Sequence, residues 1–309
     1  MRRLRNSLPV NALRWCFNFR GQRSGIGRGY LFDALSRFTP SIAVDTDGLR
    51  LYVNTRDKEV SRHTFIAGAY ERVLLARAMQ ELRKAGICGD DLEGRGFLDI
   101  GSNIGSATCL SLIQHGAGES WAFEPAPGNL GLLRQNVLAN GLTDRVHIHP
   151  VALSDEDGTV TLELSATNFG DHRVRVERPN GGAHPALLEE DRRSTFDVQA
   201  RRLDSLVEEG SIDLGSLGLV WIDVQGHEGH VFAGATKLLA SDVPIVCEYW
   251  PYGLERAGGL ERFDSLVAEA RSRFIDLATP SAPVLPTKRL SALRGQYAGL
   301  TYTDLLLLR

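Results

Sequence analysis

The stretch Gly96-Phe-Leu-Asp-Ile-Gly-Ser-Asn-Ile-Gly105 decides the fold class of this 309-residue chain. Its first half is a short apolar run of strand length, and a glycine-rich turn follows directly. A helical pattern then continues over residues 104–115. A strand, a glycine-rich turn and a helix in this order are typical of an open α/β sheet, in which ligands bind at the carboxyl ends of the strands.

Short apolar runs bounded by glycine, proline or charged residues recur along the rest of the chain. Their length and their β-branched and aromatic composition favour buried strands. The sequence predicts strands at 96–100, 120–124, 146–151, 219–223, 244–248, 274–277 and 302–308.

Helical patterns lie between these runs, so strands and helices alternate. Helices are predicted at 69–85, 104–115, 129–140, 229–240 and 260–273. The alternation predicts an α/β fold with a Rossmann-like, doubly wound and mainly parallel seven-stranded sheet. We expect residues 1–60 to form a basic arm with a helical extension, and residues 61–309 to form the domain that carries the sheet.

Two segments interrupt the alternation. Residues 158–164 have the pattern of an antiparallel strand or hairpin. The polar segment 177–195 is predicted to be an exposed loop, either a lid or a disordered stretch.

Composition limits the class of ligand. The net charge of −3 and a pI near 6.3 give no overall positive surface for a polyanion, so we expect a small-molecule partner and no nucleic acid. The four cysteines have no spacing typical of zinc ligands or of a disulfide framework. These features predict a cytoplasmic protein without a metal site.

The first 32 residues contain seven arginines and no acidic residue. Such an arm could contact a membrane surface peripherally, or it could be a solvated tail. No apolar stretch is long enough to span a membrane.

Two acidic residues are predicted to end adjacent strands. Asp99 precedes Gly101 by two residues, and Glu124 ends the next strand. The turn lacks the GxGxxG spacing that accommodates a pyrophosphate, and a carboxylate attracts a cation. S-adenosylmethionine carries an ammonium and a sulfonium group and no phosphate, so the turn favours it over NAD. Glu124 would accept hydrogen bonds from the ribose, and residues 151–155 would lie next to the adenine or form a packed strand end.

A second polar turn follows the strand predicted at 219–223. The stretch Val220-Trp-Ile-Asp-Val-Gln-Gly-His-Glu228 places three candidate proton acceptors within six positions, namely Asp223, His227 and Glu228. One of them could accept the proton of a substrate hydroxyl, although each could also cap a helix. Glu248, with Asp223, could supply half of a cation site, but two oxygen ligands do not predict a metal.

In order and spacing, the motifs resemble those of the FkbM family of S-adenosylmethionine-dependent methyltransferases, from about Phe65 to Leu307. The matching pieces are Gly68-Ala-Tyr-Glu71, Asp99-Ile-Gly-Ser-Asn-Ile-Gly105, Ala122-Phe-Glu-Pro125, 136–141, Val151-Ala-Leu-Ser-Asp155, Asn168-Phe-Gly170, Leu203-Asp204, Ile222-Asp-Val-Gln-Gly-His-Glu228 and Gly234-Ala235.

The resemblance implies a class I methyltransferase fold and O-methylation of a hydroxyl group. The acceptor would be a sugar, a glycan or glycolipid, or a polyketide-type natural product. It also implies that Tyr70 and Glu71 close over the cofactor. The predicted cofactor-binding residues are Tyr70, Glu71, Asp99, Gly101, Asn103, Gly105, Glu124 and Ala152, and the catalytic candidates are Asp223, His227 and Glu228.

The sequence departs from the family pattern at two positions. Trp221 replaces a frequent lysine, and Gln225, which cannot act as a base, replaces a frequent glutamate. A noncatalytic Rossmann-like binding module is therefore an alternative interpretation. An NAD-dependent oxidoreductase is a weaker one, because the glycine spacing disfavours it.

Overall fold

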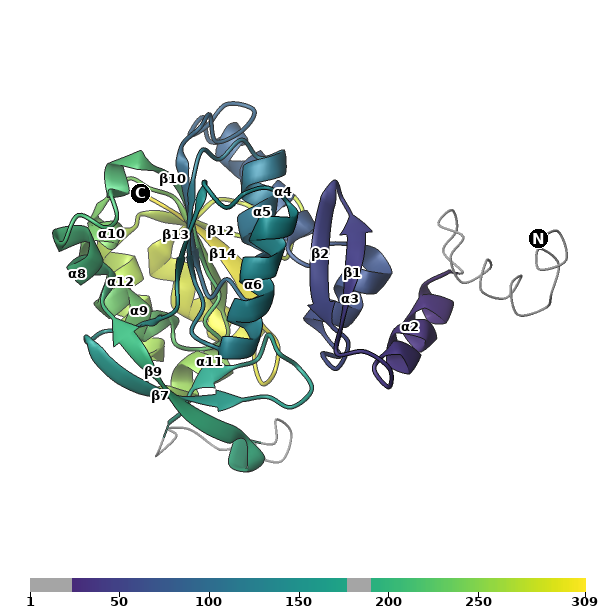
Figure 1. Cartoon of the computed structure of the whole chain (residues 1–309). Helices are drawn as coiled ribbons and strands as arrows, with labels where there is room; N and C mark the ends of the chain where they lie inside the picture. The colour runs from purple at the N-terminus through teal and green to yellow at the C-terminus, as the bar shows by residue number, and fades with distance from the viewer. Residues whose placement is uncertain (1–23, 177–189) are drawn as a thin grey trace, which may run out of the picture.

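The computed structural model describes residues 24–176 and 190–309 and is built around one large sheet (Figure 1). The strand order in this sheet is β13-β12-β14-β11-β10-β3-β4-β5. The strands from β11 to β5 are parallel, whereas β14 runs antiparallel to both of its neighbours. The bounds are β3 Gly96–Ile100, β4 Ser120–Phe123, β5 Val146–His149, β10 Leu217–Ile222, β11 Ile245–Tyr249, β12 Arg273–Asp276, β13 Leu285–Pro286 and β14 Thr303–Leu308.

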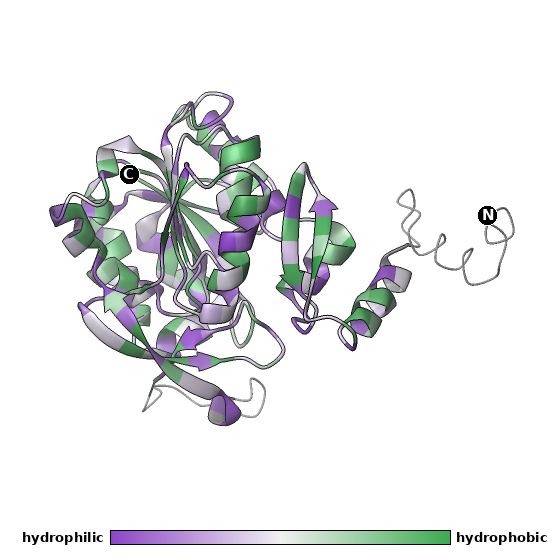
Figure 2. Cartoon of the chain, in the orientation of Figure 1, coloured by the Kyte–Doolittle hydropathy of each residue, from purple (hydrophilic) through white to green (hydrophobic). Residues whose placement is uncertain are grey.

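The predicted doubly wound sheet is confirmed, and all seven predicted strands belong to it. The eighth strand, β13, is a two-residue strand at one edge. The central strands β3, β10 and β11 are buried along their whole length, which explains their continuous apolar sequences. Figure 2 shows hydrophobic residues concentrated along these central strands.

Helices cover both faces of the sheet (Figure 1). One face packs against α4 (Arg72–Lys84), α5 (Ser106–Gln114) and α6 (Pro127–Ala139). The other packs against α8 (Leu203–Glu208), α9 (Glu228–Ala233), α10 (Thr236–Ala240) and α12 (Leu260–Ala270). Alternate residues of each strand enter the two cores, as the two-residue period of a strand requires.

The helix predicted at 229–240 is divided into α9 and α10 at Gly234 and Ala235. A Cβ atom on Gly234 would lie 2.0 Å from the carbonyl oxygen of Ser154. The glycine therefore lets the helix pair approach the loop that contains Ser154.

A smaller four-stranded sheet lies beside the main one, in the order β6-β9-β7-β8. It confirms the strand expected at 158–164, which pairs antiparallel with a strand that we did not predict, β9. Of the loop expected at 177–195, residues 177–189 lie outside the described part, and β9 already begins at Ser194. The bounds are β6 Ala152–Leu153, β7 Gly158–Leu164, β8 Arg173–Val174 and β9 Ser194–Arg201. The remaining short helices of the domain are η2 Glu190–Arg192, η3 Leu214–Ser216, α11 Pro251–Arg256, η4 Thr287–Ala292 and α13 Leu293–Gln296.

The N-terminal extension contains the expected helical part, α2 (Ser24–Leu35) and α3 (Val60–Ala67), and also a hairpin. Its strands, β1 (Ser41–Thr46) and β2 (Leu49–Asn54), are joined by Asp47 and Gly48, both at positive φ. Asp-Gly is a favoured two-residue hairpin turn.

Two asparagine side chains, one in α6 and one directly after it, attach this hairpin to the main domain. Asn136 accepts from the amide of Tyr52 at 2.5 Å and donates to its carbonyl at 3.2 Å. Asn140 bonds the backbone of Arg50 in the same two-sided way, at 2.9 and 2.8 Å. The side-chain amides of Asn136 and Asn140 therefore bond the backbone of β2 along the edge that faces away from β1, where a neighbouring strand would otherwise pair.

The arginine-rich arm lies almost wholly within residues 1–23, outside the described part, so its role stays a prediction. Within the described residues, no helix is both long enough and apolar enough to cross a membrane.

Candidate active site

A cavity of about 630 Å³ opens at the carboxyl ends of β3, β4, β10 and β11. These strands flank the point where the chain order in the sheet reverses, which is where open α/β sheets bind ligands. Loops 168–174 and 300–304 supply further parts of its wall. Most of the predicted site residues line this one cavity: Tyr70, Glu71, Asp99, Gly101, Asn103, Glu124, Ala152, Asp223 and His227.

The glycine-rich turn after β3 packs tightly against the end of β10. Gly101 has φ 87°, and a Cβ atom there would lie 1.9 Å from the carbonyl oxygen of Asp223. The amides of Gly101 and Ser102 both donate to the carbonyl of Phe123, at 3.0 and 2.9 Å. These two donors are therefore already used within the protein and are not available to a pyrophosphate.

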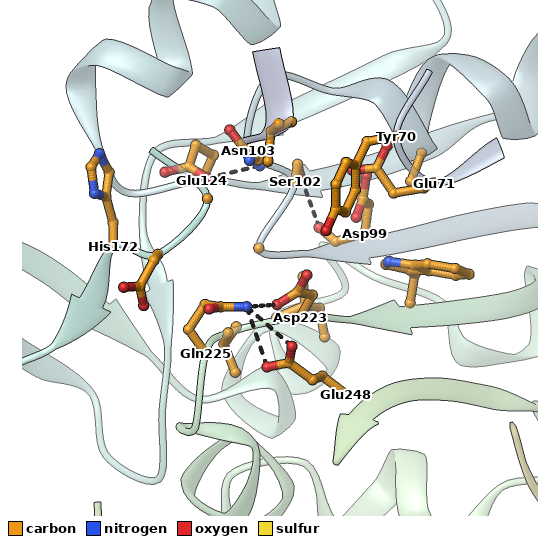
Figure 3. Close-up of a pocket in the computed structure, with 18 of the residues that line it drawn as sticks. Tyr70, Glu71, Asp99, Ser102, Asn103, Glu124, His172, Asp223, Gln225 and Glu248 are labelled. Atoms are coloured by element: carbon orange, nitrogen blue, oxygen red, sulfur yellow. Dashed lines mark hydrogen bonds between the residues drawn. The ribbon is translucent and has the colours of Figure 1, made fainter. Parts of the chain in front are cut away.

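Asp99 and Glu71 lie close together beside this turn (Figure 3). Asp99 is 1% exposed and accepts a hydrogen bond from the Thr108 hydroxyl. Burial raises its pKa to about 7, and the nearby Glu71 contributes to the rise. The Oε2 atom of Glu71 is buried and has no hydrogen-bond partner in the described part of the chain. The pair is therefore short of positive charge and of donors, which an ammonium group would supply.

Tyr70 lies next to Glu71 at the rim of the cavity and is 40% exposed. The ring of His63 packs against it edge-on, with the ring centroids 5.1 Å apart. Burial of the phenol group and its neighbour Tyr302 raise the pKa of Tyr70.

Glu124 is 5% exposed and is held by backbone amides at the end of β4. Its two oxygens accept from the amides of Ala126 and Asn103, at 2.7 and 2.8 Å. Burial raises the pKa of Glu124 to about 8, while the two amide donors act in the opposite direction. Asn103 has φ 53°, and no described residue bonds its buried Oδ1, so the turn offers a further polar contact to a ligand.

Gly105 has a different position from the other predicted cofactor residues. It begins α5 with φ 80°, and a Cβ atom there would lie 2.4 Å from Leu133. It is not among the cavity-lining residues. The structure places this glycine at a helix–helix contact, because the start of α5 passes close to α6.

Asp223 and Glu248 end the adjacent strands β10 and β11, and one amide group joins them (Figure 3). The Nε2 atom of Gln225 donates to Asp223 Oδ1 at 2.6 Å and lies 3.2–3.3 Å from both Glu248 oxygens. Burial raises the pKa of both carboxyl groups. Among the described residues, Asp223 Oδ2 accepts no hydrogen bond, so it is available to a ligand.

Glu228 lies behind the cavity rather than in its wall. Its Oε1 accepts from the amides of Val224 and Gly226, at 3.0 and 3.3 Å, so it holds the turn that contains Gln225. This placement favours a structural role, because the side chain is fully buried. Oxygens of Glu228, Asp223 and Glu248 lie within 4.8 Å of one another, but an amide of Gln225 already bonds two of the three groups. The absence of a metal stays a prediction.

His227 lines the cavity at a different place from the pair Asp223 and Glu248. Its Nε2 atom lies 2.9 Å from the Ser154 hydroxyl, and its ring stacks on His230 with centroids 4.5 Å apart. Burial lowers its pKa to about 3, so the imidazole is neutral. A neutral imidazole with so low a pKa is a weak proton acceptor.

Several lining residues were not among the predicted site residues, notably Gln225, Glu248, Tyr302 and Asp304. Asp304 is brought to the cavity because β14 runs antiparallel and pairs it with Glu248. Sequence patterns give no direction for a terminal strand, so the position of Asp304 could not be predicted.

Two curated methyltransferases are similar to part of this chain. A 2-O-methyltransferase, NoeI of Sinorhizobium fredii, is 32% identical over 159 residues, which is 50% of this chain and 62% of that protein. The hexuronic acid methyltransferase AglP of Haloferax volcanii is 29% identical over 156 residues, covering 48% of this chain and 54% of that protein. Each match thus spans less than two thirds of the relative.

Among solved structures, an FkbM methyltransferase from Methylobacillus flagellatus aligns over 91% of this chain and 59% of its own, at 14% identity and a TM-score of 0.44. The model of the methyltransferase FkbM domain matches residues 99–273. That match covers more than half of the chain and includes the glycine-rich turn, Glu124, Asp223 and Glu248. The chain therefore belongs to the FkbM methyltransferase family.

Proposed function

We propose that the protein transfers a methyl group from S-adenosylmethionine to a hydroxyl group of a sugar-type acceptor. One observation carries this proposal. A single cavity holds two carboxylate oxygens that have no hydrogen-bond partner among the described residues: the buried Oε2 of Glu71 beside the glycine-rich turn, and Oδ2 of Asp223 at the neighbouring strand end. The first suits a cationic cofactor, and the second suits a hydroxyl group that must lose a proton.

The described residues fit this cofactor. Glu71 and Asp99 would hold its ammonium group, because neither carboxyl group has a cationic partner within residues 24–176 and 190–309. Each Glu124 oxygen accepts one backbone hydrogen bond and retains a lone pair for a ribose hydroxyl. Asn103 and Ala152 line the same wall, and Tyr70 covers it at the rim.

When bound, S-adenosylmethionine supplies an electrophilic methyl group and leaves as a neutral thioether. The chain's own part is to orient the acceptor and to accept its proton. Asp223 Oδ2 takes the proton that the acceptor hydroxyl loses, while Gln225 keeps the other oxygen in place at 2.6 Å. The raised pKa of Asp223 makes it a stronger base than an exposed aspartate.

The two curated relatives support a sugar-type acceptor, because the name of one specifies 2-O-methylation and that of the other a hexuronic acid. Within this proposal the acceptor is a small sugar, a glycan or a glycolipid. A cytoplasmic location and a membrane contact through the arginine-rich arm belong to the proposal as well.

The first experiment is a calorimetric titration of the purified protein with S-adenosylmethionine, beside the double variant Asp99→Ala, Glu124→Ala and an NAD control. We expect saturable binding that the double variant loses and no binding of NAD. Transfer of labelled methyl groups to a panel of glycosides would then identify the acceptor class. Binding of NAD in place of S-adenosylmethionine would reject the proposal, and cofactor binding without transfer would support a noncatalytic module.

A further inference from the structure

We infer that His227 recognises the adenine base of the cofactor, by accepting a hydrogen bond at Nδ1 from the exocyclic amino group. The inference rests on the proposed function, because it assigns one contact within that cofactor site. It replaces the proton-accepting role that the sequence suggested for His227.

The order of the strand ends locates the base. Asp99 ends β3, Glu124 follows β4, and the segment 151–153 follows β5, which is the next strand in the sheet. Neighbouring strands lie about 4.8 Å apart, so a ligand whose ribose contacts Glu124 extends its base over the end of β5. The cavity wall is apolar here, as a purine ring requires, and is formed by Phe123, Val151, Ala152, Leu153 and Leu162.

His227 belongs to this end of the cavity, because its ring bonds Ser154, the residue that follows this apolar segment. The side chain is 8% exposed and lines the cavity. It is also the N-cap residue of α9, yet it makes no side-chain capping bond. Among the described residues Nδ1 therefore has no hydrogen-bond partner.

The neighbours of Ser154 fix which ring nitrogen carries the proton. The Ser154 hydroxyl has one proton and donates it to Asp155 Oδ1 at 3.1 Å. Ser154 must then accept from His227, so the hydrogen lies on Nε2 and Nδ1 is a bare acceptor. Asp155 is itself held by Arg262 at 2.6 Å and by His230 at 3.1 Å, so this arrangement does not depend on the ligand.

Nδ1 is not one of the described polar atoms that are buried without a partner, so a ligand in the cavity can reach it. In the apolar end of the cavity, the amino group of adenine is the donor that the proposed cofactor brings. A base with a carbonyl oxygen at that position would instead put two acceptors face to face, which costs binding free energy.

Two ligands that differ at this position test the inference. Calorimetry would compare S-adenosylhomocysteine with S-inosylhomocysteine, in which a carbonyl replaces the amino group. We expect the wild type to prefer the adenosine form by about tenfold or more, and His227→Ala to reduce that preference by at least about fivefold. His227→Asn, whose amide oxygen can take the place of Nδ1, should retain most of the preference.

The matched control is His147→Ala, since His147 is an exposed histidine on β5 that pairs with Glu119. It should keep the wild-type preference. Thermal melting would confirm that each variant is folded. The variant Ser154→Ala tests the same contact independently, because loss of the fixed His227 tautomer should also weaken the preference for the adenosine ligand. An unchanged preference in folded His227→Ala would overturn the inference, whereas a wild type that binds neither ligand would overturn the proposed function itself.

Discussion

The two ends of the cavity both use carboxyl groups at strand ends, but they hold them in different ways. At the cofactor end, backbone amides fix both oxygens of Glu124. At the acceptor end, Asp223 and Glu248 share one side-chain amide, that of Gln225, and Asp223 keeps one oxygen free. Two bonded oxygens fix Glu124 as an acceptor for a ligand hydroxyl, whereas the unbonded Oδ2 of Asp223 can take up a proton.

The comparison also explains the role of the Gln225 side chain at the acceptor end. A glutamate at this position would put a third carboxylate against two others whose pKa burial already raises. The glutamine supplies a donor instead. The departure from the family pattern therefore leaves the proposed base in place.

The largest expected effect is a loss of turnover without a loss of cofactor affinity, which would show that the two ends of the cavity have different functions. Asp223→Asn removes the proton acceptor and keeps the shape of the side chain, so turnover should fall by about 10²–10⁴-fold. Cofactor affinity, measured by calorimetry, should stay within about threefold of the wild type, because Asp223 acts at the acceptor end. Turnover near the wild-type value would remove Asp223 from the mechanism.

A second substitution disturbs the packing of the glycine-rich turn, at the cofactor end, against the end of β10, at the acceptor end. In Gly101→Ala the new methyl group would meet the carbonyl oxygen of Asp223, and positive φ adds strain. We expect the affinity for S-adenosylmethionine to fall by about 100-fold, because the turn must move.

The control for this variant is Gly128→Ala in α6, where a Cβ atom would meet nothing within 4 Å. It should bind normally and unfold at the same or a slightly higher temperature, since alanine favours a helix. Equal affinities for the two variants would show that the turn does not form the cofactor site.

The smallest expected effect tests the acceptor end alone. In Gln225→Glu a third negative charge raises the pKa of Asp223 further, and a base works only when it is deprotonated. The rise of turnover with pH should therefore move to higher pH, and activity on the acidic limb should fall about tenfold for each pH unit of that movement. The pH profile of turnover measures this shift, with S-adenosylmethionine affinity as the control. A profile that moves to lower pH would contradict the arrangement of charges proposed here.

Sequence patterns predicted the main sheet well because its central strands are buried on both faces and are therefore continuously apolar. The Asp47-Gly48 hairpin was missed although its turn carries a recognisable motif. β9 was missed because it alternates exposed and buried residues weakly and begins next to a polar segment.

The prediction of the site was more uneven. The sequence placed Asp99, Glu124 and Asp223 correctly at strand ends, because parallel strands bring their carboxyl ends to one edge. The sequence could not distinguish the roles of Asp223, His227 and Glu228. These roles depend on the direction of each side chain, which the turn after β10 sets. Their roles stay predictions until the variants are measured.

The sequence by itself determined the order of strands and helices, the glycine-rich turn and the acids that follow the central strands, because these depend on local pattern and periodicity. Only the tertiary structure decided which acids are free and which are already bonded. Gln225 lies between Asp223 and Glu248, Ser154 bonds the ring of His227, and Glu228 is buried behind the turn. Such contacts join residues from different elements, and their geometry is set by packing that no local stretch of sequence encodes.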